Sequence, residues 1–444
     1  MSDLPPVYYN KDSDSFAFET ARVRWIKIVQ DTIEDINEAI KDKSQEFIEQ
    51  GQSISKQLSS LKSDIQNDGE IKPFLNNSNI KAYGSYNEVL QNQNYTWLSG
   101  PWLILENYLY RLINSFFLAQ PLWFNYDIFN NLKKSAFESS VDGVSELAVR
   151  YYELSSNINK LDSEALKILF TEFTEISLWG NATDLSLLAT ATLDDIKSIQ
   201  GAEARKKSED KILSNDLSEA WNQISQNKGR VDFVLDNTGF ELYTDLIFAL
   251  FLIETKLSTQ VNFHTKDIPW MVSDVNIKDF YILIDELKNV EKFPLNRKEI
   301  DFFINKVEYY NNIGVLNLQT SSFWTLDKDF YEINPSEIKY GGADLYKDLL
   351  NSKLIIFKGD MNYRKLTGDR RWDPTTKFIN SIGPLASQGL KILSLRTVKA
   401  DVLVGLPQGV YEKITEEWGK TNDNKLSWLY SGKYAVISYS NGDN

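Results

Sequence analysis

The chain has 444 residues, of which 42% are apolar and 13% aromatic, so it is long and apolar enough for a large folded core and is not a disordered protein. Its formal net charge of −14 argues against nucleic acid or an anionic membrane surface as the main partner, because phosphate groups would be repelled over most of the surface. The lack of cysteine excludes disulfides, thiolate zinc sites and cysteine nucleophiles, and a single histidine, His264, argues against histidine-rich metal centres and serine-histidine-acid triads.

The first residues, Met1 to Pro6, have neither the basic start nor the apolar core of a secretory signal. The most apolar stretch, 242–253, is too short for a membrane span and is better interpreted as a buried helix. We therefore expect a cytoplasmic protein, with the nucleus as an open second location. We also expect a monomer with no nucleic-acid or membrane partner.

The first half of the chain is predicted to be mainly helical. Residues 17–64 follow a helical pattern, with Trp25, Ile33 and Ile40 among the apolar residues of one face. Further helices are expected at 102–118, 137–158 and 163–178. The charged stretch 202–210 is interpreted as a solvated helix or a linker.

After Gly229, short β-rich apolar runs alternate with amphipathic helices, which is typical of a mainly parallel sheet covered by helices. The expected strands are 231–235, 260–264, 315–318, 354–357, 392–395 and 435–438. The sequence thus predicts an α/β protein. A mainly helical N-terminal region, 1–200, would pack on a Rossmann-like, mostly parallel sheet flanked by helices, 201–444.

The first of these strands ends abruptly in an acid and an amide, Asp236 and Asn237, before Gly239 opens an apolar helix at 240–255. In an open α/β sheet, ligands bind at the carboxyl ends of the strands. The simpler interpretation is an Asp-Asn turn, since both side chains cap backbone groups well.

Two other strands end in polar residues of complementary chemistry. The run 354–357 stops at Lys-Gly-Asp and continues through an amide, a phenol and a guanidinium up to Arg364. The run 392–395 is followed by Arg396 and Lys399. Each residue alone is as well explained as a helix cap or a surface charge. The recurrence at three strand ends favours a site.

A hard divalent cation prefers carboxylate and amide oxygens together with substrate phosphate. Asp236 and Asn237 meet that demand, and Asp274, which follows the next expected strand, is a candidate third ligand. The 201–444 region is therefore expected to bind a metal and a phosphate.

The segments 231–242, 357–366 and 396–399 resemble the damage-control phosphatase family. More narrowly, they are similar to its eukaryotic sugar-phosphate phosphatase branch, subfamily III, in which an Arg-Thr-x-Lys element is characteristic. Residues 101–111 and 178–185 match as well, so the resemblance runs from about Phe16 to beyond Lys399.

The resemblance implies a metal-dependent phosphatase of sugar phosphates such as fructose 1-phosphate and fructose 6-phosphate, with a role in metabolite damage control. It implies that a divalent metal ion, Mn²⁺, Mg²⁺, Co²⁺ or Ni²⁺, is held by Asp236, Asn237 and Asp274. The expected catalytic residues are Asp236, Asp360 and Lys399. A small phosphorylated sugar is expected to contact Asp236, Asn237, Asp360, Met361, Asn362, Tyr363, Arg364, Arg396 and Lys399. Met361 stands where the family often has leucine, a change that conserves volume.

Several alternatives stay open. The nucleophile is either a metal-activated water oriented by Asp360 or Asp236, which we favour, or Asp236 itself, forming an acyl phosphate. A different class of function is an S-adenosylmethionine-dependent carboxyl methyltransferase acting on acidic protein side chains, although the expected glycine-rich turn is lacking. A third is a non-catalytic interaction protein. His264 is interpreted as packed or hydrogen-bonded and not as catalytic.

Overall fold

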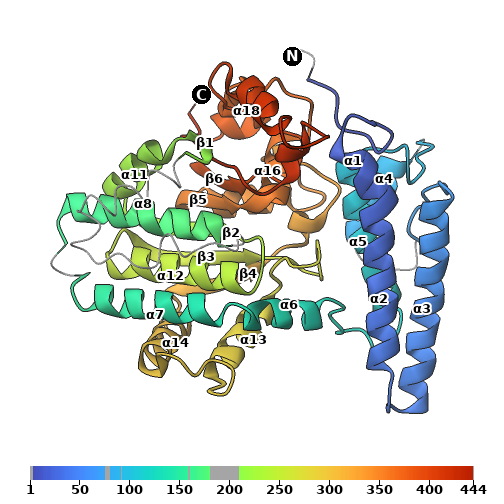
Figure 1. The fold of residues 1–444 in the computed structure, drawn as a ribbon, viewed down its shortest axis with the longest axis horizontal. Helices are drawn as coiled ribbons and strands as arrows, with labels where there is room; N and C mark the ends of the chain where they lie inside the picture. The colour runs from blue at the N-terminus through green and yellow to red at the C-terminus, as the bar shows by residue number, and fades with distance from the viewer. Residues whose placement is uncertain (1–3, 76–80, 92, 159–160, 181–209, 444) are drawn as a thin grey trace.

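The predicted α/β fold is confirmed by the computed structural model, which describes residues 4–75, 81–91, 93–158, 161–180 and 210–443. A helical N-terminal region stands beside a seven-stranded, mostly parallel sheet that helices cover on both faces (Figure 1). All but the last residue of the charged stretch 202–210, and residues 181–185 of the family match, lie outside the described residues.

The strands pair in an order that differs from their order in the chain. In sheet order they are β1 (Ile212–Asn215), β7 (Ala435–Ser440), β6 (Ile392–Thr397), β5 (Ser352–Lys358), β2 (Gly229–Val234), β3 (Ser258–Thr265) and β4 (Leu316–Thr320). The five strands from β6 to β4 run parallel to one another, whereas β7 is antiparallel to β6 and parallel to β1. The four-residue edge strand β1 was not predicted, because so short a run carries little pattern.

The central strands are buried on both faces, so their apolar residues alternate between two separate cores. Phe233 of β2 and Ile356 of β5 belong to one core. Val234 and Phe357, the next residue of each strand, belong to the other. This two-sided burial explains why the strands appear in the sequence as continuous apolar runs.

The helices divide between the two faces of the sheet. On one side lie α6 (Asn130–Glu138), α7 (Val141–Ser155), α8 (Ser163–Trp179), α11 (Leu217–Gln226), α12 (Phe240–Glu254), α13 (Ile277–Lys288) and α14 (Arg297–Asn312). On the other lie α1 (Phe16–Glu19), α2 (Trp25–Ala39), α3 (Gln45–Gln66), α4 (Lys81–Leu90), α5 (Trp102–Leu118), α15 (Gly342–Leu349), α16 (Gly359–Thr367), α17 (Phe378–Ser381) and α18 (Val410–Trp418).

Two of the predicted helices are in fact broken. The pattern over 17–64 contains a π-helical turn, Thr20–Arg24, and a tight turn between α2 and α3, where Asp42 has a φ of 57° and the Ser44 side chain caps α3. The two helices form an antiparallel hairpin on the side of the molecule opposite α8 and α11 (Figure 1). The predicted helix 137–158 is mostly α7, but its first residues belong to the end of α6, with a break at Ser139 and Ser140. Side-chain periodicity alone does not reveal such turns, since the apolar face resumes after each one.

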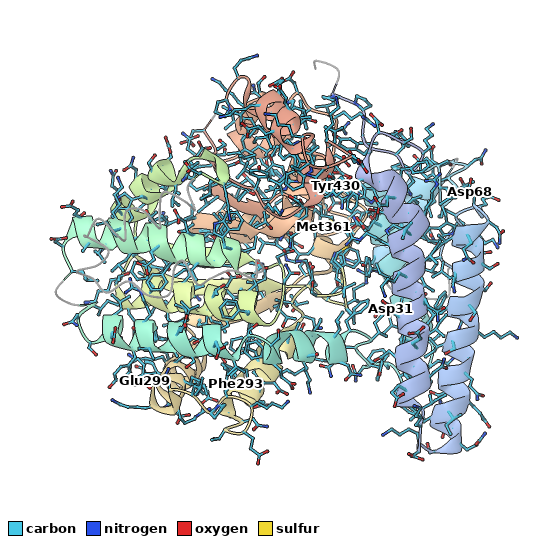
Figure 2. The ribbon with its side chains drawn as sticks, in the orientation of Figure 1. Asp31, Asp68, Phe293, Glu299, Met361 and Tyr430 are labelled. Carbon is cyan, nitrogen blue, oxygen red and sulfur yellow. The ribbon has the colours of Figure 1, made fainter. Side chains whose placement is uncertain are left out.

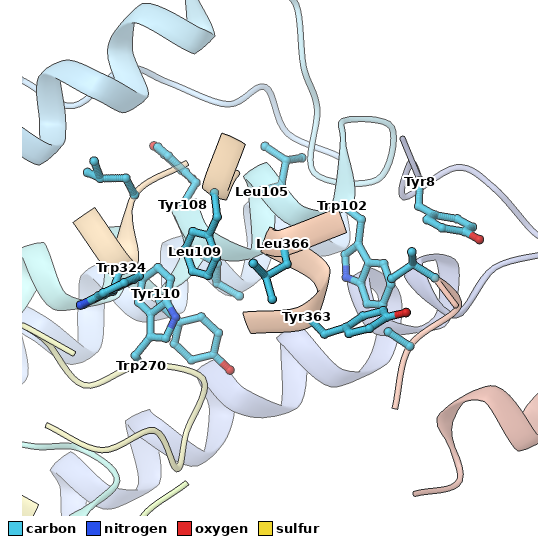
Figure 3. Packing of buried hydrophobic residues seen from close by; sticks show 14 of the residues in the cluster. Tyr8, Trp102, Leu105, Tyr108, Leu109, Tyr110, Trp270, Trp324, Tyr363 and Leu366 are labelled. Atoms are coloured by element: carbon cyan, nitrogen blue, oxygen red, sulfur yellow. The ribbon is translucent and has the colours of Figure 1, made fainter. Parts of the chain in front are cut away.

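Helix α5 joins the helical region to the sheet, and Figure 3 shows Trp102 of α5 beside Tyr363 of α16. Helices α7 and α8, which also precede residue 200, pack against α12 on the sheet. The division at residue 200 therefore stays a prediction. No helix of the described ranges is both long and apolar enough to cross a membrane.

Candidate active site

The polar strand ends meet where the strand order reverses. From β2 the chain proceeds to β3 and β4 on one side, whereas β5 and β6 lie on the other side of β2. Such a reversal leaves a crevice at the carboxyl ends of the two central strands, and this is where α/β sheets bind ligands. Here β2 leads to Asp236 and Asn237, while β5 leads to Gly359 and Asp360.

A short antiparallel bridge brings Asp274 to the same place. Asn237 pairs with Asp274, and the Val275 amide donates to the Asp236 carbonyl at 2.8 Å. Two residues before Asp274, Val272 has a φ of 70°, which is a strained conformation for a β-branched residue. Strained backbone conformations of this kind cluster at functional sites. The structure thus places the three expected metal ligands side by side.

Gly359 lets the start of α16 approach Asp236 closely. Its φ is 81°, and a Cβ atom at this position would lie 1.9 Å from Asp236 Oδ2. Any larger residue would therefore displace the carboxylate. This requirement for glycine was not foreseen from the sequence.

The site concentrates buried negative charge. Burial raises the pKa of the Asp236 carboxyl well above its usual range, the nearby charges of Asp274 and Glu241 raise it further, and Lys266 and Lys399 oppose them. Burial also raises the pKa of Asp274, although the Lys266 ammonium lies 3.0 Å from its Oδ2. Two buried carboxylates therefore lie beside this one buried ammonium. The donor set therefore fits a hard cation, which would hold these carboxylates ionised.

Asp360, Arg396 and Lys399 form one connected unit on the β5–β6 side. Asp360 Oδ1 accepts from Arg396 Nε at 2.8 Å and from the Lys399 backbone amide at 3.1 Å. The Arg396 guanidinium is fully buried, and it also donates to the carbonyls of Ala400 and Val402. Arg396 thus holds the loop that carries Lys399, and the half-buried Lys399 side chain lies near enough to Asp236 to lower its pKa.

The other residues expected to contact substrate are buried among protein partners. Asn362 donates to the carbonyls of Val234, Leu235 and Lys358, while the Tyr363 hydroxyl accepts from the Val404 amide. Met361 is 8% exposed and lies between the sheet and the helical hairpin (Figure 2). In this structure these side chains support the walls of the site.

Arg364 connects α16 to the helical region. It donates to Glu106 at 2.6 Å and to Asp369 at 2.9 Å, and its guanidinium carbon lies 3.7 Å from the ring centroid of Trp102. Arg111, on the same helix as Glu106, instead pairs with Asp267 at 3.3 Å. One buried ion pair thus joins the helical region to α16, and a second joins it to the segment after β3.

A second group of acids beneath the site was missed from the sequence. Lys358 Nζ donates to Glu241 at 3.0 Å, to Asp245 at 2.8 Å and to the Ser177 carbonyl at 2.7 Å. Glu241 in turn accepts from Asn237. A signal was present, because Glu241 and Asp245 stand four residues apart in an otherwise apolar helix, and a lysine ends an apolar strand.

A cavity of about 570 Å³ opens beside Asn237. It lies between the 237–241 segment and helices α6 and α7, and its polar lining includes Ser139, Ser140, Asp142, Glu146 and Ser273. Neither α6 nor α7 was expected to contribute to the site. The cavity is large enough for a small polar molecule.

Asp232, His264 and Asp348 form a further possible metal site, with ligand atoms within 4.8 Å of one another. The Arg230 guanidinium already donates to both acids, at 2.8 and 2.9 Å. His264 Nε2 lies 2.8 Å from Asp232 Oδ1, which confirms that this histidine is packed and hydrogen-bonded. The arginine makes a neutralised ion-pair network the better interpretation. Asp232 precedes Asp236 by four residues, roughly 13 Å along an extended strand.

Residues 20–414 match the family model described as the damage-control phosphatase ARMT1-like domain. The chain belongs to this family. It is 33% identical to damage-control phosphatase ARMT1 of Danio rerio over 98% of this chain and 97% of that protein, and 33% identical to that of Bos taurus over 99% of each. The human protein is 32% identical over 99% of each chain. The family comprises metal-dependent hydrolases, which agrees with the acids assembled here.

Among solved structures, a DUF89 family protein of Pyrococcus horikoshii matches with a TM-score of 0.37 and 13% identity, covering 87% of this chain and 93% of that one. This similarity is too low to bear on the site.

Proposed function

We propose that this protein is a metal-dependent phosphatase of sugar monophosphates such as fructose 1-phosphate and fructose 6-phosphate, acting in metabolite damage control. Within the family we assign it to the branch with the Arg-Thr-x-Lys element, here 396–399. The observation that carries the proposal is the meeting of Asp236, Asn237 and Asp274 with Asp360 and Lys399 at one edge of the sheet.

Asp236, Asn237 and Asp274 would hold a divalent cation, Mn²⁺, Mg²⁺, Co²⁺ or Ni²⁺. When bound, this cation supplies Lewis-acid polarisation of the phosphoryl group. Lys399 neutralises the negative charge that develops on the phosphoryl and leaving oxygens. The Lys399 backbone amide donates to Asp360, which also accepts from Arg396, so these two residues together position the Lys399 side chain.

The neighbouring cavity supports a polyol as the leaving group. Its hydroxyl and carboxylate lining can accept hydrogen bonds from sugar hydroxyls, and its volume of about 570 Å³ accommodates a hexose. We propose water, oriented by Asp360, as the nucleophile, because the Asp236 carboxylate is committed to the cation. An aspartyl phosphate trapped by acid quench would show that Asp236 attacks instead.

The direct test is phosphate release from a panel of sugar phosphates by the metal-stripped chain, with each of the four cations added back. We expect release that depends on the cation and that Asp236→Ala abolishes. Asp373→Ala, which removes an exposed acid elsewhere, serves as the control. No cation-dependent release from the parent chain would refute the proposal. Methyl transfer from S-adenosylmethionine would favour the other class of enzyme.

A further inference from the structure

The side-chain amide of Asn237 lies between two carboxylates, which accept hydrogen bonds, and a hydroxyl group, which donates one. Its Nδ2 donates to Glu241 Oε2 at 2.8 Å and to Asp236 Oδ2 at 2.7 Å, whereas its Oδ1 accepts from the Ser273 hydroxyl. An ionised carboxylate can only accept, so Glu241 requires the NH₂ group on its own side. Asp236 accepts from the same NH₂ group, so the two carboxylates together direct the amide oxygen, the only atom of the group that can bind a metal, toward Ser273.

Glu241 is itself immobilised by Lys358. Its Oε1 accepts from the Lys358 ammonium, whose other contacts are Asp245 and the Ser177 carbonyl. Lys358, Glu241 and Asp245 are exposed by only 1%, 5% and 0%. The three donors of the ammonium are all used, so neither Lys358 nor Glu241 is free to turn.

Charge balance alone does not explain why two acids surround one lysine. Asp245 is sufficient to neutralise the Lys358 ammonium, and a second buried carboxylate is costly to desolvate. Of the two acids, Glu241 is the one that contacts Asn237. Its presence is explained by that contact.

We propose that Glu241 and Lys358 are positioning residues, which fix the amide of Asn237 so that its oxygen is presented for metal binding. This inference rests on the proposed function, in which Asn237 is a metal ligand. Lys358 lies outside the cavity assigned to the sugar, whereas Glu241 is part of its lining, so the test has to read metal binding without substrate. Both residues act through Asn237, and partners of this kind are worth about 10- to 100-fold in metal affinity.

The structure offers a matched pair of variants. Glu241→Gln and Asp245→Asn each remove one negative charge from the same ammonium, but only the first alters the contact with Asn237. A glutamine must turn its oxygen to Lys358, so its NH₂ group opposes the NH₂ group of Asn237. We expect Glu241→Gln to weaken Mn²⁺ binding by about 10- to 100-fold, and Asp245→Asn to change it by less than about threefold.

The measurement is electron paramagnetic resonance of free Mn²⁺ titrated with the metal-stripped full-length chain, with thermal unfolding as the check of folding. Glu241→Asp provides a second variant, because it keeps the charge but is one methylene too short to reach both Lys358 and Asn237. It should lose Mn²⁺ affinity as Glu241→Gln does.

Two results would overturn the inference while leaving the proposed function intact. One is equal weakening by Glu241→Gln and Asp245→Asn, which would assign the effect to charge. The other is parental Mn²⁺ affinity in Glu241→Asp or Glu241→Gln. A parent chain that binds no divalent cation would refute the proposed function and the inference together.

Discussion

Replacing Gly359 by alanine tests the geometry of the site most directly. The new Cβ atom would lie 1.9 Å from Asp236 Oδ2, whereas ordinary contact begins at 3.4 Å, so the carboxylate has to move by about 1.5 Å. A misplacement of about 1 Å at a reacting group costs roughly 100-fold in rate. We expect kcat/KM for fructose 1-phosphate, measured as Mn²⁺-dependent phosphate release, to fall by about 100-fold or more.

The positive φ of Gly359 also costs stability in the variant, by about 1–2 kcal/mol for any residue with a Cβ. Gly409→Ala controls for this cost, because Gly409 has a φ of 82° and no atom within 4 Å of its added Cβ. Urea unfolding should show a loss of stability in both variants, with activity lost in Gly359→Ala alone. Activity in Gly359→Ala within about threefold of that in Gly409→Ala would refute the argument that Asp236 must occupy this position.

Three further predictions address residues around the site. His264→Gln should lower the free energy of unfolding, because it disturbs the buried contact with Asp232, and should leave Mn²⁺ affinity unchanged. A loss of Mn²⁺ affinity would show that Asp232, His264 and Asp348 form a metal site. Arg364→Gln should lower the free energy of unfolding by about 3–5 kcal/mol, because Glu106 stays buried without its cation, and should leave KM unaltered. A raised KM at unchanged stability would instead indicate that Arg364 contacts the substrate. Burial raises the pKa of Asp401 from 3.8 to about 6, so its contribution to stability is complete below about pH 4 and is lost as the pH rises through 6. This loss is at most about 3 kcal/mol, of which about half falls between pH 5 and 7.5. Asp401→Asn should remove that part from urea unfolding curves compared at these two pH values. Identical pH dependence in parent and variant would contradict the prediction.

The sheet could be predicted because its strands are buried on both faces. Continuous apolar runs such as 354–357 are then conspicuous, and the abrupt change to Asp236 and Asn237 marks the strand end where ligands bind. Strand order is less accessible from sequence, since it depends on which crossovers the helices allow. The placement of β5 beside β2, which creates the crevice, became visible only in the structure.

The limits of prediction at the site follow from side-chain direction. Asp360, Arg396 and Lys399 do form one unit, whereas Arg364 pairs with Glu106 and the Tyr363 hydroxyl accepts from the Val404 amide. A motif specifies which residues occur together and not which way each points. The role of Gly359 depends on the distance between two chain segments more than a hundred residues apart, and no local pattern encodes that distance.

The direct passage from β5 into α16 has a consequence for how this scaffold can diversify. Lys358 ends the strand and Gly359 begins the helix, so no loop between them can be lengthened or exchanged. We therefore expect differences in substrate preference to arise elsewhere, in the side chains of α6 and α7 that line the cavity beside Asn237. Among proteins with this fold, we expect the shape of the site around Asp360 and Lys399 to be nearly constant. The side chains of α6 and α7 that face the cavity should differ between members that act on different substrates.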